Sequence, residues 1–146
     1  LMANAKIWQG TINQFSSLVK KYNPQVLAGI ESRGFIFASS IGYKLGCDVI
    51  MIRKKGKLPG KTISHTYKLE YGEDCLEIQK REILKNKNIV LIDDLLATGG
   101  TAGAAIELLQ KIEANVSVFL TLIELTNLKG RNKIKVKTDS LISFDE

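Results

Sequence analysis

Two adjacent acids, Asp93 and Asp94, stand between an apolar run at 89–92 and a loop of small residues at 97–101 (ATGGT). Glycines let a backbone approach a phosphate closely, and the start of a following helix favours negative charge. The two carboxylates would accept hydrogen bonds from vicinal hydroxyls such as those of a ribose. An ordinary capped turn is the alternative, but the paired acids after a buried strand favour a sugar-phosphate site. The loop has neither the Gly-Lys-Ser/Thr ending of a Walker A motif nor a GxGxxG pattern.

Other charged side chains follow apolar runs or lie near them. Arg33 stands three residues after the apolar run at 26–30, and this place after a buried strand favours a ligand role over a surface turn. The cations at 53–57 would suit a small anionic substrate, although each lysine alone is typical of solvated surface. Glu70 in a Leu-Glu-Tyr alternation is, by itself, typical of an exposed strand. His65, the sole histidine, has no partner that the sequence indicates, and we expect it to be incidental.

Hydrophobic periodicity predicts the elements that must position these groups. Spacings of three and four predict amphipathic helices over 7–22, 35–45 and 101–112. Short apolar runs predict buried strands over 26–30, 49–52, 89–92 and 116–125. A short helix is expected at 128–134. Residues 67–71 and 74–79 are expected to form a β-hairpin that turns at Gly72.

This alternation predicts an α/β fold with a mainly parallel central sheet flanked by helices. Ligands of such sheets bind beyond the carboxyl ends of the strands, so the loops at Glu31, Arg53 and Asp93 should converge. Residues 54–68 carry little periodicity and are expected to be a long loop, the start of a flexible lid over about 54–72. The whole chain, 1–146, is expected to be one domain.

Bulk composition narrows the class of protein. The chain has a net charge of +6, but its cations are spread along the sequence and no RNA-binding aromatic signature accompanies them, which argues against a nucleic-acid partner. No apolar stretch approaches the ~20 residues that span a bilayer, so no membrane partner is expected. Two cysteines, Cys47 and Cys75, are expected to be buried free thiols, as in a cytoplasmic protein.

Several blocks together resemble one enzyme family. Residues 89–101 (IVLIDDLLATGGT) resemble the motif with which type I phosphoribosyltransferases bind phosphoribosyl pyrophosphate (PRPP). Residues 31–35 (ESRGF) resemble that family's pyrophosphate loop, and 53–60 (RKKGKLPG) and 67–72 (YKLEYG) resemble the start and return of its flexible lid. Residues 124–131 (ELTNLKGR) are similar to the base-proximal stretch of the adenine-specific branch.

The resemblance implies a role for each matching residue. The 5′-phosphate would be held by Ala97, Thr98, Gly99, Gly100 and Thr101, and the ribose hydroxyls by Asp93 and Asp94. The pyrophosphate would be held by Ser32, Arg33 and the backbone near Glu31, with positive charge added by Arg53, Lys54 and Lys57. Glu70 would be the catalytic group that handles the proton on the purine imidazole ring, and Leu125 would pack near the base.

The implied reaction is purine salvage: adenine and PRPP give AMP and pyrophosphate. The resemblance also implies a homodimer and Mg²⁺, which the substrate phosphates would largely hold, so no dedicated metal cage is expected. Two alternatives stay open: a guanine, xanthine or hypoxanthine phosphoribosyltransferase, and a PRPP-sensing regulator. Family members usually carry an N-terminal hood over the purine that has no counterpart in these residues, so we expect residues 1–146 alone to turn over adenine weakly.

Overall fold

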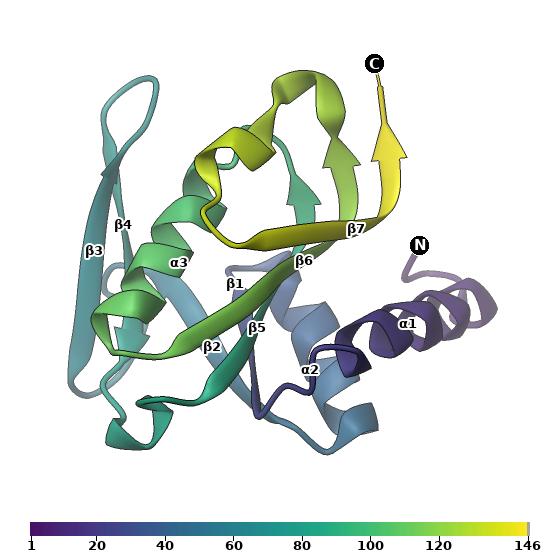
Figure 1. Ribbon diagram of the computed structural model, residues 1–146, viewed down its shortest axis with the longest axis horizontal. Coiled ribbons are helices and arrows are strands. Elements are labelled where there is room, and N and C mark those ends of the chain that lie inside the picture. The colour runs from purple at the N-terminus through teal and green to yellow at the C-terminus, as the bar shows by residue number, and fades with distance from the viewer. Residues whose placement is uncertain (146) are drawn as a thin grey trace.

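Unbroken apolar runs form the centre of the sheet. The computed structural model describes residues 1–145. Its central strand is β1 (Val26–Ile30), every residue of which is buried. This strand pairs in parallel with β2 (Asp48–Lys54) and with β5 (Asn88–Leu96). Two further parallel strands, β6 (Asn115–Leu125) and β7 (Lys137–Phe144), follow β5. The predicted α/β architecture is confirmed, with strand order β3-β4-β2-β1-β5-β6-β7 within the described residues (Figure 1).

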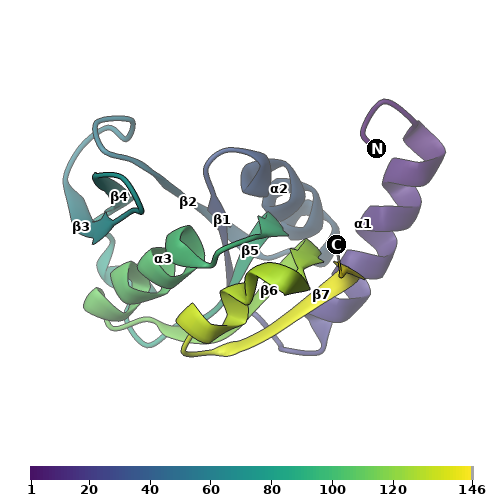
Figure 2. The same ribbon diagram turned by 90° about the horizontal axis from the view of Figure 1, so that it is seen from above.

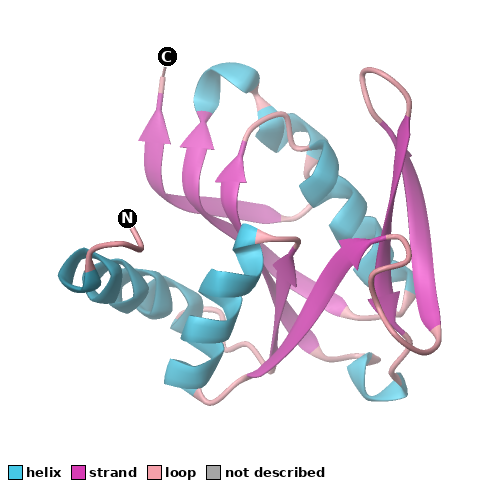
Figure 3. Cartoon of the chain, turned by 180° about the vertical axis from the view of Figure 1, so that it is seen from behind, coloured by secondary structure: helices cyan, strands magenta, loops and turns pink. Residues whose placement is uncertain are grey.

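An antiparallel hairpin extends the sheet beyond β2. It consists of β3 (Thr62–Lys68) and β4 (Glu73–Gln79), and it lies at the edge opposite β7 (Figures 1 and 3). A hairpin that turns at Gly72 was predicted, but its first strand was expected at 67–71 and lies at 62–68. The loop expected at 54–68 was therefore wrong over about half of its length. Residues 62–68 pair with β4 in unbroken register, and their alternate side chains Ile63, His65 and Tyr67 are half-buried. The loop is therefore only the segment 55–61.

Three helices cover the two faces of the sheet. They are α1 (Ala5–Lys20), α2 (Arg33–Leu45) and α3 (Gly100–Lys111), all close to their predicted ranges. Helix α1 begins two residues before its prediction because the side chain of Asn4 caps it and accepts the Ile7 amide at 3.1 Å. Gly46 ends α2 as predicted, in a left-handed conformation with φ 69°.

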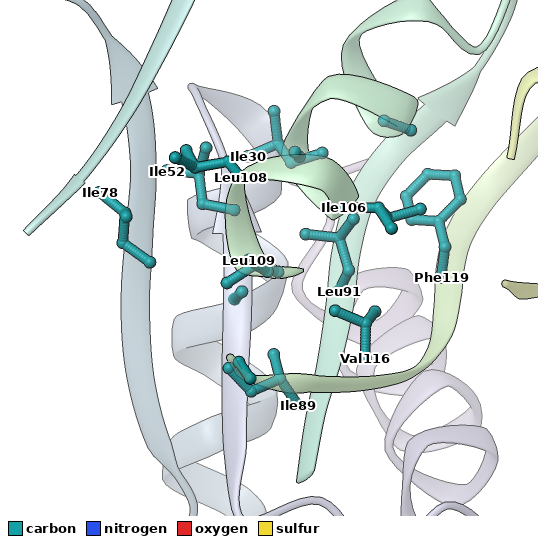
Figure 4. Packing of buried hydrophobic residues seen from close by; sticks show 14 of the residues in the cluster. Ile30, Ile52, Ile78, Ile89, Leu91, Ile106, Leu108, Leu109, Val116 and Phe119 are labelled. Carbon is teal, nitrogen blue, oxygen red and sulfur yellow. The ribbon is translucent and has the colours of Figure 1, made fainter. Parts of the chain in front are cut away.

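The sheet separates two hydrophobic cores, with α1 and α2 on one side and α3 on the other (Figure 2). Successive residues of β5 point alternately to these cores: Leu91 packs among the α3 side chains and Ile92 among those of α1 and α2. Figure 4 shows Leu108 of α3 beside Ile30 and Ile52. Burial on both faces is the reason that the central strands appear in the sequence as unbroken apolar runs.

Two further sequence-based expectations need correction, and two elements were not expected. The run at 49–52 is not buried on both faces, because Val49 and Met51 are 39% and 44% exposed. The helix expected at 128–134 is replaced by two 3₁₀ turns, η2 (Thr126–Leu128) and η3 (Gly130–Lys133). A further 3₁₀ turn, η1 (Glu82–Leu84), and strand β7 were not predicted. No helix in the described chain is long and apolar enough to cross a membrane.

Candidate active site

The loops that follow β1, β2 and β5 enclose a cavity of about 490 Å³ at the carboxyl edge of the sheet. One wall is the turn Glu31, Ser32 and Arg33. The other is the segment 93–102, which comprises the end of β5, the connection 97–99 and the start of α3. Lys54 from the end of β2 completes the lining. The predicted convergence of the three loops is therefore confirmed.

The predicted phosphate loop, residues 97–101, lines this cavity at the start of α3. Gly99 is the N-cap residue of the helix and has φ 79°, a left-handed backbone conformation that residues other than glycine rarely adopt. No side chain occupies the cap, so the first amides of α3 remain available to an anion.

The two acids differ in environment although they are neighbours at the end of β5. Burial raises the pKa of Asp93 to about 8, and the negative charge of Asp94 acts in the same direction. Asp93 Oδ1 accepts the Asp94 amide at 2.8 Å. At neutral pH Asp93 therefore holds a proton, whereas the Asp94 carboxylate accepts a hydrogen bond from Arg33 Nε across the cavity.

The side chain of Glu31 attaches the turn that contains Arg33 to the end of β2. Its Oε2 accepts the Lys54 amide at 2.5 Å and its Oε1 lies 3.3 Å from Arg53 Nη2. The Glu31–Ser32 peptide bond is cis. Gly34 allows α2 to approach β5, because a Cβ atom there would lie 2.8 Å from the Ile92 carbonyl oxygen.

Lys54 links the cavity to the hairpin. Its ammonium group pairs with Asp74 of β4 and lies 3.3 Å from the hydroxyl of Tyr67. The contact with Lys54 lowers the pKa of Asp74. The Tyr67 hydroxyl in turn lies 3.5 Å from Thr101 Oγ1 in the phosphate loop. The hairpin and the phosphate loop are thus joined through side-chain hydroxyls.

Four of the predicted site residues lie outside the cavity. Arg53 points to Glu31 and donates to the Lys57 carbonyl oxygen at 3.2 Å, and Lys57 itself is exposed in the loop 55–61. Glu70 is exposed at the tip of the hairpin. Leu125 is half-buried at the end of β6 and does not line the cavity. The other predicted site residues all line it.

Sequence reasoning missed several side-chain roles. The Glu31 carboxylate was not expected to contact Arg53, and Tyr67 and Asp74 carried no assigned role. His65, for which the sequence indicates no partner, has one in the structure, because its Nε2 lies 2.7 Å from Glu107 Oε2 on α3. The alternation of Ile63, His65 and Tyr67 is the signal that would have indicated an inward-facing histidine. Within residues 1–145, no three His, Cys, Asp or Glu side chains are grouped as metal ligands would be.

Comparisons with known proteins agree with this geometry. The model of the phosphoribosyl transferase domain matches residues 1–144. Adenine phosphoribosyltransferase of Rhodospirillum rubrum is 50% identical over 145 residues, which are 99% of this chain and 85% of the relative.

Solved structures give the same result. Adenine phosphoribosyltransferase of Thermoanaerobacter pseudethanolicus superposes with a TM-score of 0.93 at 39% identity, covering 98% of this chain and 84% of the other. The Saccharomyces cerevisiae enzyme, solved in complex with an imino-altritol bisphosphate and adenine, gives 0.90 at 38% identity, covering 96% and 82%.

Proposed function

The chain belongs to the adenine phosphoribosyltransferase family, and we propose that it transfers the phosphoribosyl group of PRPP to adenine, giving AMP and pyrophosphate. The observation that carries this proposal is the single cavity in which a cationic turn faces a phosphate loop, with two acids between them. A substrate with a phosphate at one end of a ribose and a pyrophosphate at the other would place a negative group against each of these walls and its ribose hydroxyls against the acids.

In the proposed complex the 5′-phosphate accepts hydrogen bonds from the amides of residues 97–101 and from the hydroxyls of Thr98 and Thr101. The ribose hydroxyls donate to Asp93 and Asp94. Ser32 and Arg33 hold the pyrophosphate. Arg33, which contacts Asp94 in the free protein, would then divide its donors between Asp94 and the substrate.

Breaking the bond between C1 and pyrophosphate leaves positive charge on the ribose and negative charge on the leaving group. Arg33 and Lys54 are positioned donors for the leaving group, and such preorganised charge is commonly the largest catalytic contribution. Once Asp93 has released its proton, its carboxylate oxygens and those of Asp94 are hard donors that would suit Mg²⁺ near the substrate phosphates. When bound there, Mg²⁺ would neutralise part of the pyrophosphate charge.

Closure of the hairpin would bring Glu70 to the base. Glu70 lies at the hairpin tip, outside the cavity, so a proton transfer at the purine requires the tip to move toward the phosphate loop. Leu125 would pack near the base and Lys57 would add positive charge from the loop 55–61. A closed hairpin would also exclude water from the activated sugar.

We also propose that the protein is a cytoplasmic homodimer. Both cysteines are free, which suits a reducing compartment, although they are half-buried rather than buried as expected. A shallow hollow of about 350 Å³ is lined by the side chains of Phe35, Ile36, Ser39, Val49 and Met51. This apolar face lies next to the turn that holds Arg33, so a second copy seated there would adjoin the pyrophosphate subsite.

A turnover assay tests the proposed function. The protein as its gene encodes it should form AMP and pyrophosphate from PRPP, Mg²⁺ and adenine, and guanine, xanthine and hypoxanthine should not compete. Turnover of another purine in place of adenine would identify the related salvage enzyme instead. PRPP binding with no turnover of any purine would favour the regulatory alternative.

Two matched substitutions separate catalysis from binding. Glu70→Gln should lower the turnover number by roughly 10²-fold or more, since general acid–base catalysis contributes roughly 10²–10⁴-fold, and should change PRPP affinity little. Asp94→Asn should instead weaken PRPP binding, because it removes the charge shared by the ribose hydroxyls and Arg33. Full activity of Glu70→Gln would refute the assignment of the proton-transfer group.

A further inference from the structure

The backbone of Gly130 packs directly against the phosphate loop. A Cβ atom built on Gly130 would lie 2.3 Å from the Ala97 carbonyl oxygen and 3.1 Å from the Gly99 nitrogen. In the opposite direction, a Cβ atom on Gly99 would lie 2.2 Å from the Gly130 carbonyl oxygen. Two backbones touch here, and no side chain other than hydrogen fits between them.

The contact continues along the first turn of α3. A Cβ atom on Gly103 would lie 3.0 Å from the Lys133 carbonyl oxygen, so η3 follows the helix from Gly99 to Gly103. Gly130 is buried although its neighbours Lys129 and Arg131 are exposed. The turn Gly130–Lys133 therefore forms the outer wall of the phosphate loop.

A single ion pair holds this turn in place. Arg131 donates from Nε to Glu124 Oε1 at 2.6 Å and from Nη2 to Glu124 Oε2 at 2.5 Å, a bidentate pair. The Glu124 side chain is only 6% exposed, and it also accepts from Ser140 Oγ at 3.3 Å. Arg131 Nη1 donates in addition to the Thr138 carbonyl oxygen of β7. Glu124 is paired in the sheet with Leu96, the residue before the phosphate loop.

We infer that Glu124 and Arg131 are positioning residues that set the shape of the 5′-phosphate subsite by pressing Gly130 against Ala97 and Gly99. The stretch 124–131 then serves the sugar phosphate at its Gly130 end, in addition to the base-proximal role expected at Leu125. This inference rests on the proposed function of the loop 97–101 as a phosphate site. It requires no contact between Arg131 and the ligand.

Calorimetric titration with two probes tests the inference. Ribose 5-phosphate reports on the loop 97–101, and magnesium pyrophosphate reports on the Arg33 side of the cavity. Arg131→Lys keeps a positive charge but cannot form the bidentate pair, so we expect it to bind ribose 5-phosphate about tenfold more weakly, the loss that corresponds to about 1.4 kcal/mol of misplaced contacts. Its affinity for magnesium pyrophosphate should stay within twofold of the wild type.

Two further variants guard against a purely structural explanation. Gly130→Ala leaves the ion pair intact but forces the loop outward, and it should show the same selective loss. Glu113→Gln removes a carboxylate from the Lys85 pair near the other end of α3, and it should leave both affinities unchanged. A variant that merely destabilised the fold would weaken both probes together.

The outcomes separate this inference from the proposed function. If the wild type binds neither probe, the proposed sugar-phosphate site is wrong. If the wild type binds ribose 5-phosphate and both Arg131→Lys and Gly130→Ala bind it equally well, the site stands and the positioning role is overturned. Equal weakening of both probes in Arg131→Lys and Gly130→Ala would also overturn it.

Discussion

At the scale of single residues, the raised pKa of Asp93 means that its carboxyl group is protonated at neutral pH in the free protein. An aspartate that is neutral at pH 7 donates as well as accepts hydrogen bonds, whereas its ionised form accepts only. Asp94 next to it is already paired with Arg33. Asp93 thus presents a protonated carboxyl group to an incoming ribose beside the Arg33–Asp94 pair, and a bound Mg²⁺ would favour release of that proton.

The proton on Asp93 has a consequence for stability that Asp93→Asn should reveal. The folded-state pKa of about 8 is above the ordinary 3.8, so between these values the folded protein keeps a proton that the unfolded chain has released. The contribution of Asp93 to the free energy of unfolding therefore falls as the pH rises from about 4 to about 8, by at most about 1.4 kcal/mol per pH unit, and is constant above that range. Asparagine mimics the neutral form and removes this slope.

Urea unfolding at about pH 5.5, 7 and 8.5 measures the difference. Asp93→Asn should gain stability relative to the wild type as the pH rises. Asp139→Asn is the matched control, because Asp139 Oδ1 accepts the amide of the next residue at the same 2.8 Å, and it should follow the wild-type slope. Identical slopes for Asp93→Asn and the wild type would contradict the assignment.

At the scale of elements, the site depends on how closely α2 approaches β5. Gly34→Ala would place a Cβ atom 2.8 Å from the Ile92 carbonyl oxygen and 3.1 Å from Asp93 Oδ1. We expect a loss of about 1–3 kcal/mol in the free energy of unfolding, the usual cost of overpacking. Gly10→Ala in α1 is the matched control. No atom lies within 4 Å of a Cβ atom built on Gly10, so this substitution should raise the free energy of unfolding by about 0.5–1 kcal/mol. Equal stability of the two variants would argue against the tight α2–β5 contact.

The hairpin is held to α3 by the pair of His65 and Glu107 and by Lys111 Nζ, which lies 3.3 Å from the Ser64 carbonyl oxygen. Glu107→Ala should therefore accelerate amide hydrogen exchange in β3 severalfold. Because Glu107 is 46% exposed, the global free energy of unfolding should change by less than about 1 kcal/mol. Gln110→Ala, exposed one turn further along α3, should leave β3 exchange unchanged. Unaltered exchange in Glu107→Ala would show that the pair does not restrain the hairpin.

At the scale of the whole molecule, the apolar hollow beside the pyrophosphate turn should decide the oligomeric state. Met51→Lys would place a charge on this face, and the proposed dimer should dissociate into monomers in sedimentation equilibrium. Ile83→Lys introduces the same charge at another exposed apolar residue, 67% accessible on η1, and should leave the dimer intact. A monomeric wild type, or a dimeric Met51→Lys, would disprove this interface.

The sequence predicts strands best where both faces of the strand are buried. The runs at 26–30 and 89–92 are buried on both faces and were correctly predicted as central strands. The run at 49–52 is also entirely apolar but has one open face, and composition alone does not distinguish these cases. Strand β7 was missed because it is an edge strand without a fully buried residue, and its first half, Lys-Thr-Asp-Ser, is polar like an exposed surface segment.

In the site, too, some features were predictable from local sequence and others depend on tertiary structure. Residues that follow strands, such as Arg33 and Asp94, were predicted to converge, because parallel strands present their carboxyl ends at one edge. The contact between Glu31 and Arg53 was not predictable, since it depends on the register in which Ile30 pairs with Ile52. The packing of Gly130 on Gly99 likewise depends on tertiary structure that no local pattern encodes.

The position of β1 between β2 and β5 also sets the order in which the chain can fold. A nascent chain can pair β1 with β2 early, but the other edge of β1 must wait for β5, which leaves the ribosome only after the whole hairpin. Such non-local pairing is slow, because loop-closure entropy must be overcome first. The wall that carries Arg33 is therefore synthesised before the opposite wall of the cavity, which includes residues 93–102 and is complete only after β5 has joined the sheet.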